Sequence, residues 1–266
     1  MKVIDVENEL NGEEKNMENE EYYKTIFKRK SIRKYDPKPL DEEKIDEIKS
    51  FTRSLKPLYP DIKTELKIIS GEDVKSLIQK KAPHYIAVFS ENQEGYLTNI
   101  GFMLQQMDLY LSGHGIGSCW QGIPKPTKEV LKSSDLEFVI LIAFGSPKEE
   151  LYRSTSQFKR KSLNEITNIE GGDELLETVR IAPSATNSQP WYFTGNNDLI
   201  HCYCKKLNFL KAKLLAEWNK IDMGIALYHL TVSAKHHNKT AKIIQDPEGE
   251  TNPPKGYYYI ASVKID

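Results

Sequence analysis

The chain of 266 residues has no excess of charge of either sign, because 37 Lys and Arg residues face 38 Asp and Glu residues. A formal charge of -1 provides no global basic field for a nucleic acid or an anionic membrane, so any phosphate binding must be local. Three cysteines, Cys119, Cys202 and Cys204, are too few for a disulfide framework. No stretch resembles a secretory signal or the roughly 18 or more apolar residues of a membrane span. We therefore expect a cytoplasmic protein that binds neither nucleic acid nor membrane.

The first twenty residues are rich in Glu and Asn and poor in aromatic residues. Such a segment buries too little apolar surface to offset the entropy of ordering, so residues 1–20 are predicted to be a mobile acidic tail. A short helix from Glu21 to about Lys28 follows. The rest of the chain is long enough to bury a substantial core in one domain or two.

Four segments carry clear hydrophobic patterns. Residues 41–54 predict a helix with Asp41 as N-cap, and the apolar run 85–89 predicts a buried strand. Residues 97–112 predict a central helix that ends in the glycine-rich turn HGIGSCWQG. The run 138–145 is apolar along its whole length, as expected of a strand inside a covered sheet.

The second half of the chain repeats this plan. Residues 224–238 align with residues 101–115 at a constant offset of 123, which matches Gly224 to Gly101 and Leu227 to Leu104. A helix that begins at Asp173 corresponds to the helix of residues 41–54, and a final strand of residues 257–263 corresponds to 138–145. Two buried helices can look alike by chance, but the shared order of elements favours an internal duplication.

Four motifs stand in this framework: RKSIR at 29–33, GSCWQG at 117–122, RKSL at 160–163 and APSATNSQPW at 182–191. Together they resemble the FMN-dependent nitroreductase family, and they span most of residues 25 to 263. The ten-residue APSATNSQPW string is the specific part of the match, because basic pentapeptides with a serine are common.

One departure from the family pattern shapes the prediction. In the family, the asparagine motif follows the arginine motif by a few tens of residues, and each pocket of a homodimer borrows the asparagine loop from the partner. Here the gap runs from Arg33 to Ala182, and the first copy has residues 51–54, FTRS, where the loop is expected. The second copy lacks both the R-x-S-x-R motif and the W-x-G turn. Each copy therefore keeps what the other has lost.

The resemblance thus implies an α+β, nitroreductase-like fold in which two degenerate copies are fused as a pseudo-dimer, each a central sheet flanked by helices. We expect a first half at 21–167, a second half at 168–266 and one composite FMN pocket. A monomer is the simplest assembly, since the ancestral interface is internal. A homodimer that exchanges halves is the alternative.

The resemblance also assigns the site. It assigns contacts with the phosphate and ribityl end of FMN to Arg29, Lys30, Ser31 and Arg160. It assigns the contact with the ring edge at N1 and O2 to Arg33. It assigns contacts with the N5 edge to Trp120, Gln121 and Gly122. The flavin contacts from the second-copy loop are assigned to Pro183, Ser184, Ala185 and Asn187. Without the resemblance, Arg29 and Arg160 would be interpreted as surface charges. For Trp120, a core aromatic residue remains the alternative. Trp191 is interpreted as core packing behind the loop.

The implied activity is FMN-dependent hydride transfer from NAD(P)H, bound transiently, to a small electron-poor acceptor such as a nitroaromatic or quinone, in a ping-pong cycle. No side chain is needed as a strong acid or base. No metal site is expected, because Cys202 and Cys204 share a strand face without a second cysteine pair, which favours an apolar buried role. A flavin-sequestering protein with little turnover and a scaffold without flavin are the alternatives.

Overall fold

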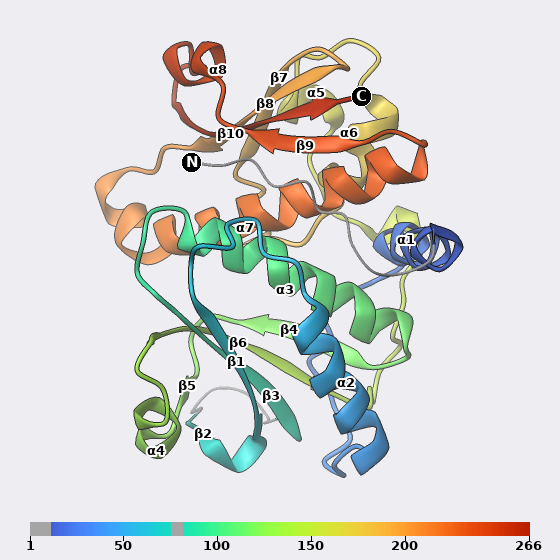
Figure 1. The fold of residues 1–266 in the computed structure, drawn as a ribbon, viewed down its shortest axis with the longest axis vertical. Coiled ribbons are helices and arrows are strands. Elements are labelled where there is room, and N and C mark those ends of the chain that lie inside the picture. The colour runs from blue at the N-terminus through green and yellow to red at the C-terminus, as the bar shows by residue number, and fades with distance from the viewer. Residues whose placement is uncertain (1–11, 76–81) are drawn as a thin grey trace. The chain divides into compact units, whose positions relative to one another are not determined.

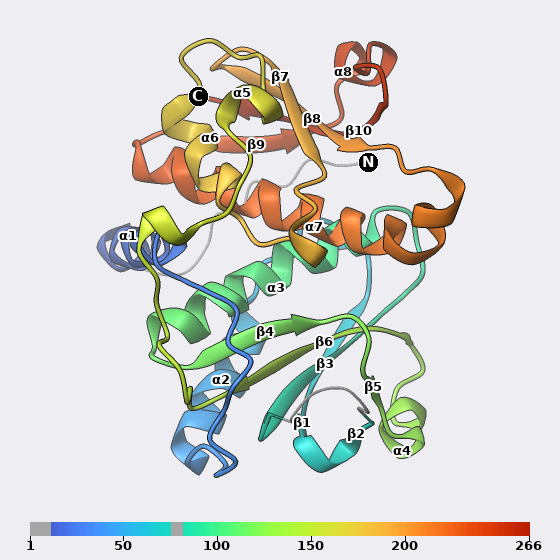
Figure 2. The same cartoon turned by 180° about the vertical axis from the view of Figure 1, so that it is seen from behind.

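The computed structural model describes residues 12–75 and 82–266, which form two compact units (Figures 1 and 2). The N-unit comprises Lys28–Ser154. The C-unit comprises Thr155–Asp266 together with the chain up to Phe27.

The N-unit contains a four-stranded antiparallel sheet of order β1-β3-β6-β4. Helix α3 packs against the sheet at β4, and 15 of its residues are buried, including the polar Asn99 and Asp108. The elements are α2 (Glu42–Ser54), β1 (Thr64–Ser70), η1 (Gly71–Asp73), β2 (Val74–Lys75), β3 (His84–Ser90), α3 (Tyr96–Gly113), β4 (Gly117–Gln121), β5 (Lys125–Pro126), α4 (Lys128–Lys132) and β6 (Glu137–Gly145). The predicted strands and central helix are confirmed as β3, β6 and α3.

The C-unit contains a second four-stranded antiparallel sheet, of order β7-β8-β10-β9. Helix α7 packs on β8, β9, α6 and α1. The elements are α1 (Gly12–Ile26), η2 (Thr155–Gln157), α5 (Leu163–Ile166), α6 (Asp173–Arg180), η3 (Ala185–Asn187), β7 (Trp191–Gly195), β8 (Leu199–Lys205), α7 (Phe209–His236), β9 (Ala241–Ile244), α8 (Pro247–Thr251) and β10 (Tyr257–Ile265).

The two units repeat one topology, which confirms the predicted duplication. In each, two antiparallel strands are followed by the long helix and then by an edge strand. The last strand pairs with that edge strand and with the second of the first two strands. The offset of 123 carries the C-terminal end of α3 onto that of α7, and residues 117–121 of β4 onto 240–244, which include β9. Leu104 and Leu227, matched by this offset, are both fully buried. The fold is an α+β fold made of two fused copies.

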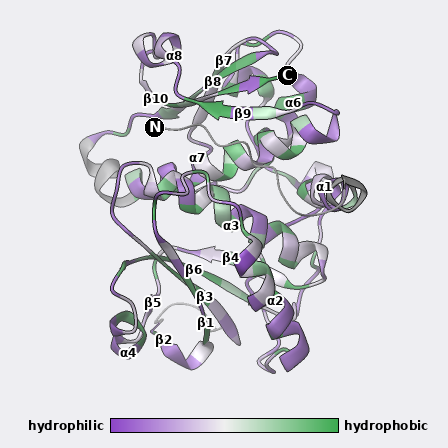
Figure 3. Cartoon of the chain, viewed as in Figure 1, coloured by the Kyte–Doolittle hydropathy of each residue, from purple (hydrophilic) through white to green (hydrophobic). Residues whose placement is uncertain are grey.

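The surface helices are built differently from these two core helices. Helix α2 is amphipathic, with Ile48 buried and most of its other residues exposed, and Figure 3 shows it as largely hydrophilic. Asp41 is its N-cap residue, as predicted, although its side chain makes no capping hydrogen bond. None of the helices in the described part of the chain is both long and apolar enough to cross a membrane.

The predicted division of the chain is corrected at both boundaries. Residues 12–20 are not a tail but part of α1, whose Asn19 side chain donates to the carbonyl of Val232. Residues 1–11 lie outside the described residues. The expected break between 167 and 168 is wrong as well, because Thr167 forms a β-bridge with Phe193. These long-range contacts place both segments in the C-unit.

Two local predictions in the N-unit are also corrected. GSCWQ, expected to belong to a turn, is strand β4, because it pairs with β6 from Gly117↔Gly145 to Gln121↔Leu141. Phe51–Ser54, expected to replace the loop, is the last turn of α2. The segment that follows the C-cap Leu55 therefore takes the place of the loop.

Candidate functional site

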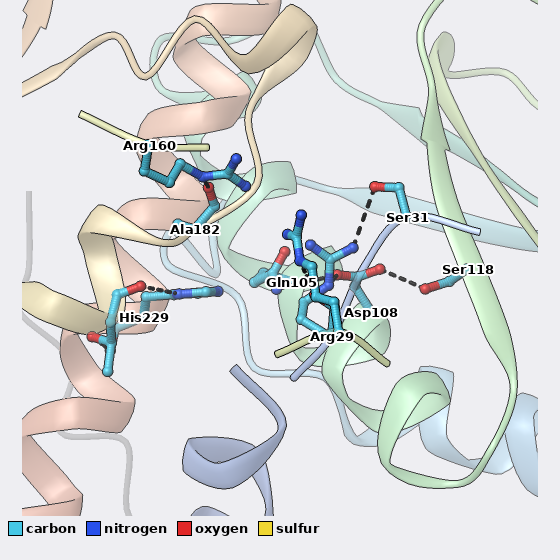
Figure 4. Close-up of polar contacts among 10 residues, drawn as sticks. Arg29, Ser31, Gln105, Asp108, Ser118, Arg160, Ala182 and His229 are labelled. Carbon is cyan, nitrogen blue, oxygen red and sulfur yellow. Dashed lines mark hydrogen bonds and ion pairs between the residues drawn. The ribbon is translucent and has the colours of Figure 1, made fainter. Parts of the chain in front are cut away.

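The first residue of the RKSIR motif, Arg29, forms a buried ion pair with Asp108 of α3 (Figure 4). Arg29 Nε is 3.0 Å from Asp108 Oδ2, and the two side chains are 2% and 0% exposed. Arg29 Nη2 also lies 3.4 Å from Ser31 Oγ. Asp108 accepts hydrogen bonds from Ser118 Oγ at 2.6 Å and Gln105 Nε2 at 3.3 Å. The guanidinium is thereby held in one place rather than exposed as a surface charge.

Backbone pairing sets the position of the RKSIR segment against β4. The N–H of Ile32 donates to the carbonyl of Ser118 at 2.9 Å, and Ile32 is fully buried. Gly117 permits this approach, since a Cβ there would lie 2.8 Å from the Ile32 side chain. The motif and the strand predicted to carry the N5 contact are therefore joined within one unit.

The other two basic residues of the motif are more accessible. Glu149 accepts the backbone N–H groups of Arg33 and Lys34 at 2.8 and 3.1 Å and lies 3.7 Å from Lys30 Nζ. Burial alone would raise the pKa of Glu149, but these donors outweigh it and hold the pKa below its usual range. The Arg33 side chain is exposed, and its Nη1 donates to the carbonyl of Ser31 at 3.3 Å.

At the end of β4 the predicted residues differ in accessibility. Trp120 is half-buried, Gln121 is buried and Gly122 is exposed. Beside them, burial raises the pKa of the Cys119 thiol, and the charges of Arg33 and Arg29 oppose that shift. Cys119 is therefore a packing residue rather than a reactive thiolate.

The N-unit residues that fit FMN are a fixed cation and an unused donor. Arg29 is held by its ion pair with Asp108, and the buried Trp120 Nε1–H makes no hydrogen bond within the described part of the chain. A buried donor without an acceptor calls for an explanation, and a fixed cation and a free donor in one unit suit an anionic group with several oxygen acceptors. The phosphate and ring acceptors of FMN match this donor set.

The APSATNSQPW loop lies in the C-unit between α6 and β7. Thr186, Asn187 and Gln189 have φ values of 54°, 59° and 46°, in the left-handed region that few non-glycine residues adopt. Ser184 Oγ accepts the N–H of Gln189 at 3.0 Å. Asp222 of α7 accepts the N–H of Ala185 with both carboxylate oxygens, at 3.0 and 3.1 Å. The loop is thus strained locally and held by specific side chains.

The basic segment 159–161 is tied to this loop. Arg160 Nε donates to the carbonyl of Ala182 at 3.1 Å (Figure 4). Its Nη1 donates to Asn187 Oδ1 at 2.5 Å. The guanidinium lies 5.7 Å from the ring centroid of buried Phe158. Asn187 Nδ2 donates back to the carbonyl of Lys159 at 2.9 Å. Arg160, expected in the first half, therefore belongs to the C-unit.

Lys161 and Gln189 form a second connection between the basic segment and the loop, and it was not predicted from the sequence. Gln189 Oε1 accepts the backbone N–H of Lys161 at 2.7 Å, and Lys161 Nζ donates to the Gln189 carbonyl at 2.8 Å. Burial, followed by the charge of Lys205, lowers the pKa of Lys161. Trp191, as predicted, is fully buried in β7.

The structure thus gathers the predicted residues in two sets. In the N-unit, Arg29 and Ser31 interact directly, and the RKSIR segment is bonded to β4, which carries Trp120 and Gln121. In the C-unit, Arg160 interacts with Ala182 and Asn187. Asp108 and Asp222 were not predicted as site residues, although Asp108 is a lone carboxylate in the apolar helix α3, which is a detectable signal.

The cysteines of β8 are deeply buried thiols. Cys202 and Cys204 are both fully buried, and burial raises the pKa of the Cys204 thiol to about 11. Nearby, ligand atoms of His201, Asp246 and Glu248 lie within 4.8 Å of one another. His201 Nδ1 is 2.7 Å from Ser262 Oγ, and Asp246 caps α8, so two of the three already have structural partners.

The chain matches a nitroreductase family model, and its fold is nitroreductase-like. The model of the family described as “Putative TM nitroreductase” matches residues 21–234. A solved structure of a “putative nitroreductase” from Thermotoga maritima is 18% identical, with a TM-score of 0.63, and the match covers 100% of this chain and 97% of that one. An FMN-dependent nitroreductase from Clostridium difficile R20291 is 21% identical, with a TM-score of 0.40, over 52% of this chain and 96% of that one. No curated protein matches the chain.

Proposed function

This chain belongs to the family described as “Putative TM nitroreductase”, and we propose that it is an FMN-dependent oxidoreductase. In this proposal it takes a hydride from NAD(P)H and reduces a small electron-poor acceptor, such as a nitroaromatic or a quinone, in a ping-pong cycle. Membership of a nitroreductase family supports the broader class of oxidoreductase.

The observation that carries the proposal is the division of complementary motifs between the duplicated units. The N-unit has the arginine motif with its buried cation, but Leu55-Lys56-Pro57-Leu58-Tyr59 follows α2 where the loop motif would be. The C-unit has the loop motif after α6 but no R-x-S-x-R segment. We therefore expect one FMN per chain, because each of the two motifs occurs once.

The proposed roles follow the chemistry of each group. Arg29, Lys30, Ser31 and Arg160 would bind the phosphate and ribityl chain through charge-assisted hydrogen bonds. Pro183, Ser184, Ala185 and Asn187, with Trp120, Gln121 and Gly122, would orient the ring. When bound, FMN supplies the redox chemistry, since its N5 atom accepts a hydride that the acceptor later receives. The protein itself provides binding, orientation and charge, and we propose that it does so as a monomer.

Arg33→Ala is expected to lower the reduction potential of bound FMN. A fixed cation at the ring edge stabilises the negative charge of the reduced form, and each loss of about 1.4 kcal/mol lowers a two-electron potential by about 30 mV. Potentiometric titration of the wild type and the variant measures the shift, with Lys34→Ala as the matched control because Lys34 is an exposed neighbour. An unchanged potential in a spectrally normal holoprotein would refute the role of Arg33.

Steady-state kinetics with FMN-loaded protein test the function itself. The proposal predicts NAD(P)H-dependent reduction of a nitroaromatic or quinone with parallel-line, ping-pong kinetics. Tight FMN binding without reduction by NADH or NADPH would contradict it and favour a flavin-sequestering protein. Failure to bind any flavin would contradict it in favour of a scaffold.

A further inference from the structure

The duplicated helices carry polar residues at one matched position. The offset of 123 that aligns α3 with α7 places Asn99 at the position of Asp222. Both side chains are buried, at 0% and 3% exposed. Polar groups this deep in a core helix require hydrogen-bond partners.

Both side chains bind the backbone at the same point of the chain. Asn99 Oδ1 accepts the N–H of Tyr59 at 2.9 Å, and Asp222 accepts the N–H of Ala185. Each accepted N–H lies four residues after the C-cap of the preceding helix, Leu55 for α2 and Ile181 for α6, and each segment has a proline two residues after that C-cap. The contact is therefore an inherited feature of the fold.

Burial without a counter-charge favours a neutral Asp222, whereas the hydrogen-bond donors around its oxygens favour the charged form. Both carboxylate oxygens face the single N–H of Ala185, and Ser188 Oγ lies 3.4 Å from Oδ2. Within the described residues no cation forms an ion pair with Asp222. The titratable groups that sense its charge or share its surroundings are Cys204 of β8 and, on α7 itself, Lys220. Burial raises the pKa of Asp222 to about 8, against the opposing effect of the Ala185 and Ser188 hydrogen bonds.

We propose that Asp222 is a positioning residue for the FMN-binding loop 182–190, which it holds as a neutral acid in the way that Asn99 holds Tyr59 with an amide. This inference rests on the proposed function of the loop. Because the loop carries three strained φ angles, it keeps its shape only where surrounding contacts fix it. Loss of the Asp222 proton places a charge in this buried site and weakens FMN binding.

Three variants test the proposal: Asp222→Ala, Asp222→Asn and Asn99→Ala. Fluorescence titration with FMN at pH 7 should give a dissociation constant at least about tenfold higher for Asp222→Ala, since a buried N–H loses its acceptor. Asp222→Asn should stay within about threefold of the wild type, because an amide oxygen replaces the acceptor. Asn99→Ala removes the matched contact from a segment without the loop motif, so its effect should also be within about threefold.

The dependence on pH separates this role from simple packing. Between pH 7 and pH 9 the wild-type dissociation constant should rise up to about tenfold, and that of Asp222→Asn should not show this rise. Equal effects of Asp222→Ala and Asn99→Ala, or the same pH dependence in wild type and Asp222→Asn, would overturn the proposal. The comparison of wild type with Asp222→Asn decides the matter even where Asp222→Ala fails to fold.

Amide hydrogen exchange makes failure of this inference distinguishable from failure of the proposed function. In the protein without flavin, the Ala185 amide should be protected in the wild type and in Asp222→Asn and exchange faster in Asp222→Ala. The Tyr59 amide serves as the internal reference and should respond only to Asn99→Ala. If FMN does not bind but this pattern holds, the function is wrong and the positioning role stands. Unchanged Ala185 exchange in Asp222→Ala overturns the positioning role.

Discussion

Arg29→Ala is expected to lower the free energy of unfolding by about 3–5 kcal/mol, because it leaves a buried carboxylate without its cation. Asp108 would retain only Ser118 and Gln105 as hydrogen-bond donors at 0% side-chain exposure. The same substitution should raise the FMN dissociation constant at least about tenfold, since one charge-assisted hydrogen bond contributes about 1.5–3 kcal/mol. Urea unfolding and FMN titration measure the two effects.

A second substitution separates the structural role of Arg29 from its role in binding. Asp108→Asn in the Arg29→Ala background removes the unpaired charge and keeps an acceptor for Ser118 Oγ, so stability should recover in large part. FMN affinity should remain low, because the phosphate still lacks its cation. Recovery of affinity together with stability would show that Arg29 serves only to neutralise Asp108, which contradicts the proposed phosphate contact.

The contribution of the buried Asp222 carboxyl to the free energy of unfolding is expected to fall as the pH rises from about 4 to about 8. The pKa of this carboxyl is about 8 in the fold against an ordinary value of 3.8, so over this range the folded state keeps a proton that the unfolded state has lost. Stability decreases with pH wherever the folded state binds more protons. At about 1.4 kcal/mol per pKa unit, the full effect is on the order of 5 kcal/mol.

Asp222→Asn isolates this contribution, because the remaining groups titrate alike in both proteins. Urea unfolding at intervals from pH 5 to pH 9 should show the variant gaining stability over the wild type as the pH rises, with a plateau above about pH 8. Parallel curves would mean that Asp222 is ionised in the folded protein at neutral pH, contrary to its proposed neutral state.

Much of the architecture could be predicted because it depends on local hydrophobic pattern. The apolar run 85–89 and the helical spacing of residues 97–112 gave β3 and α3 within a residue or so. The constant offset between residues 101–115 and 224–238 indicated the duplication that the matched sheet orders confirm. These features repeat over many residues, so a single unusual residue does not obscure them.

The errors lie where distant contacts outweigh local composition. Residues 12–20 look like a tail, but α1 is held by α7, as the contact of Glu20 with His236 at 2.7 Å illustrates. Gly117 and Gly122 suggested a turn, but pairing with β6 makes Gly117–Gln121 a strand. The pairing of β4 with β6 joins residues 20 or more positions apart, so the composition of residues 117–121 does not reveal it.

The site could be predicted only as far as the motifs extend. Arg29, Arg160 and Asn187 belong to the motifs and could be named from the sequence. Asp108 and Asp222 hold the motif segments from core helices that the motifs do not include, so only the structure identified their partners. The distinction between contact residues and the residues that position them requires side-chain geometry.

The central claim is that two degenerate copies together provide one flavin site, and the FMN stoichiometry of the purified chain tests it most directly. The visible spectrum and cofactor identification after incubation with FMN should give one FMN per chain, bound more weakly in Arg29→Ala and in Asp222→Ala. Two FMN per chain would mean that each copy keeps a complete site. None would mean that the chain retains the fold without the cofactor, and either result would contradict the account.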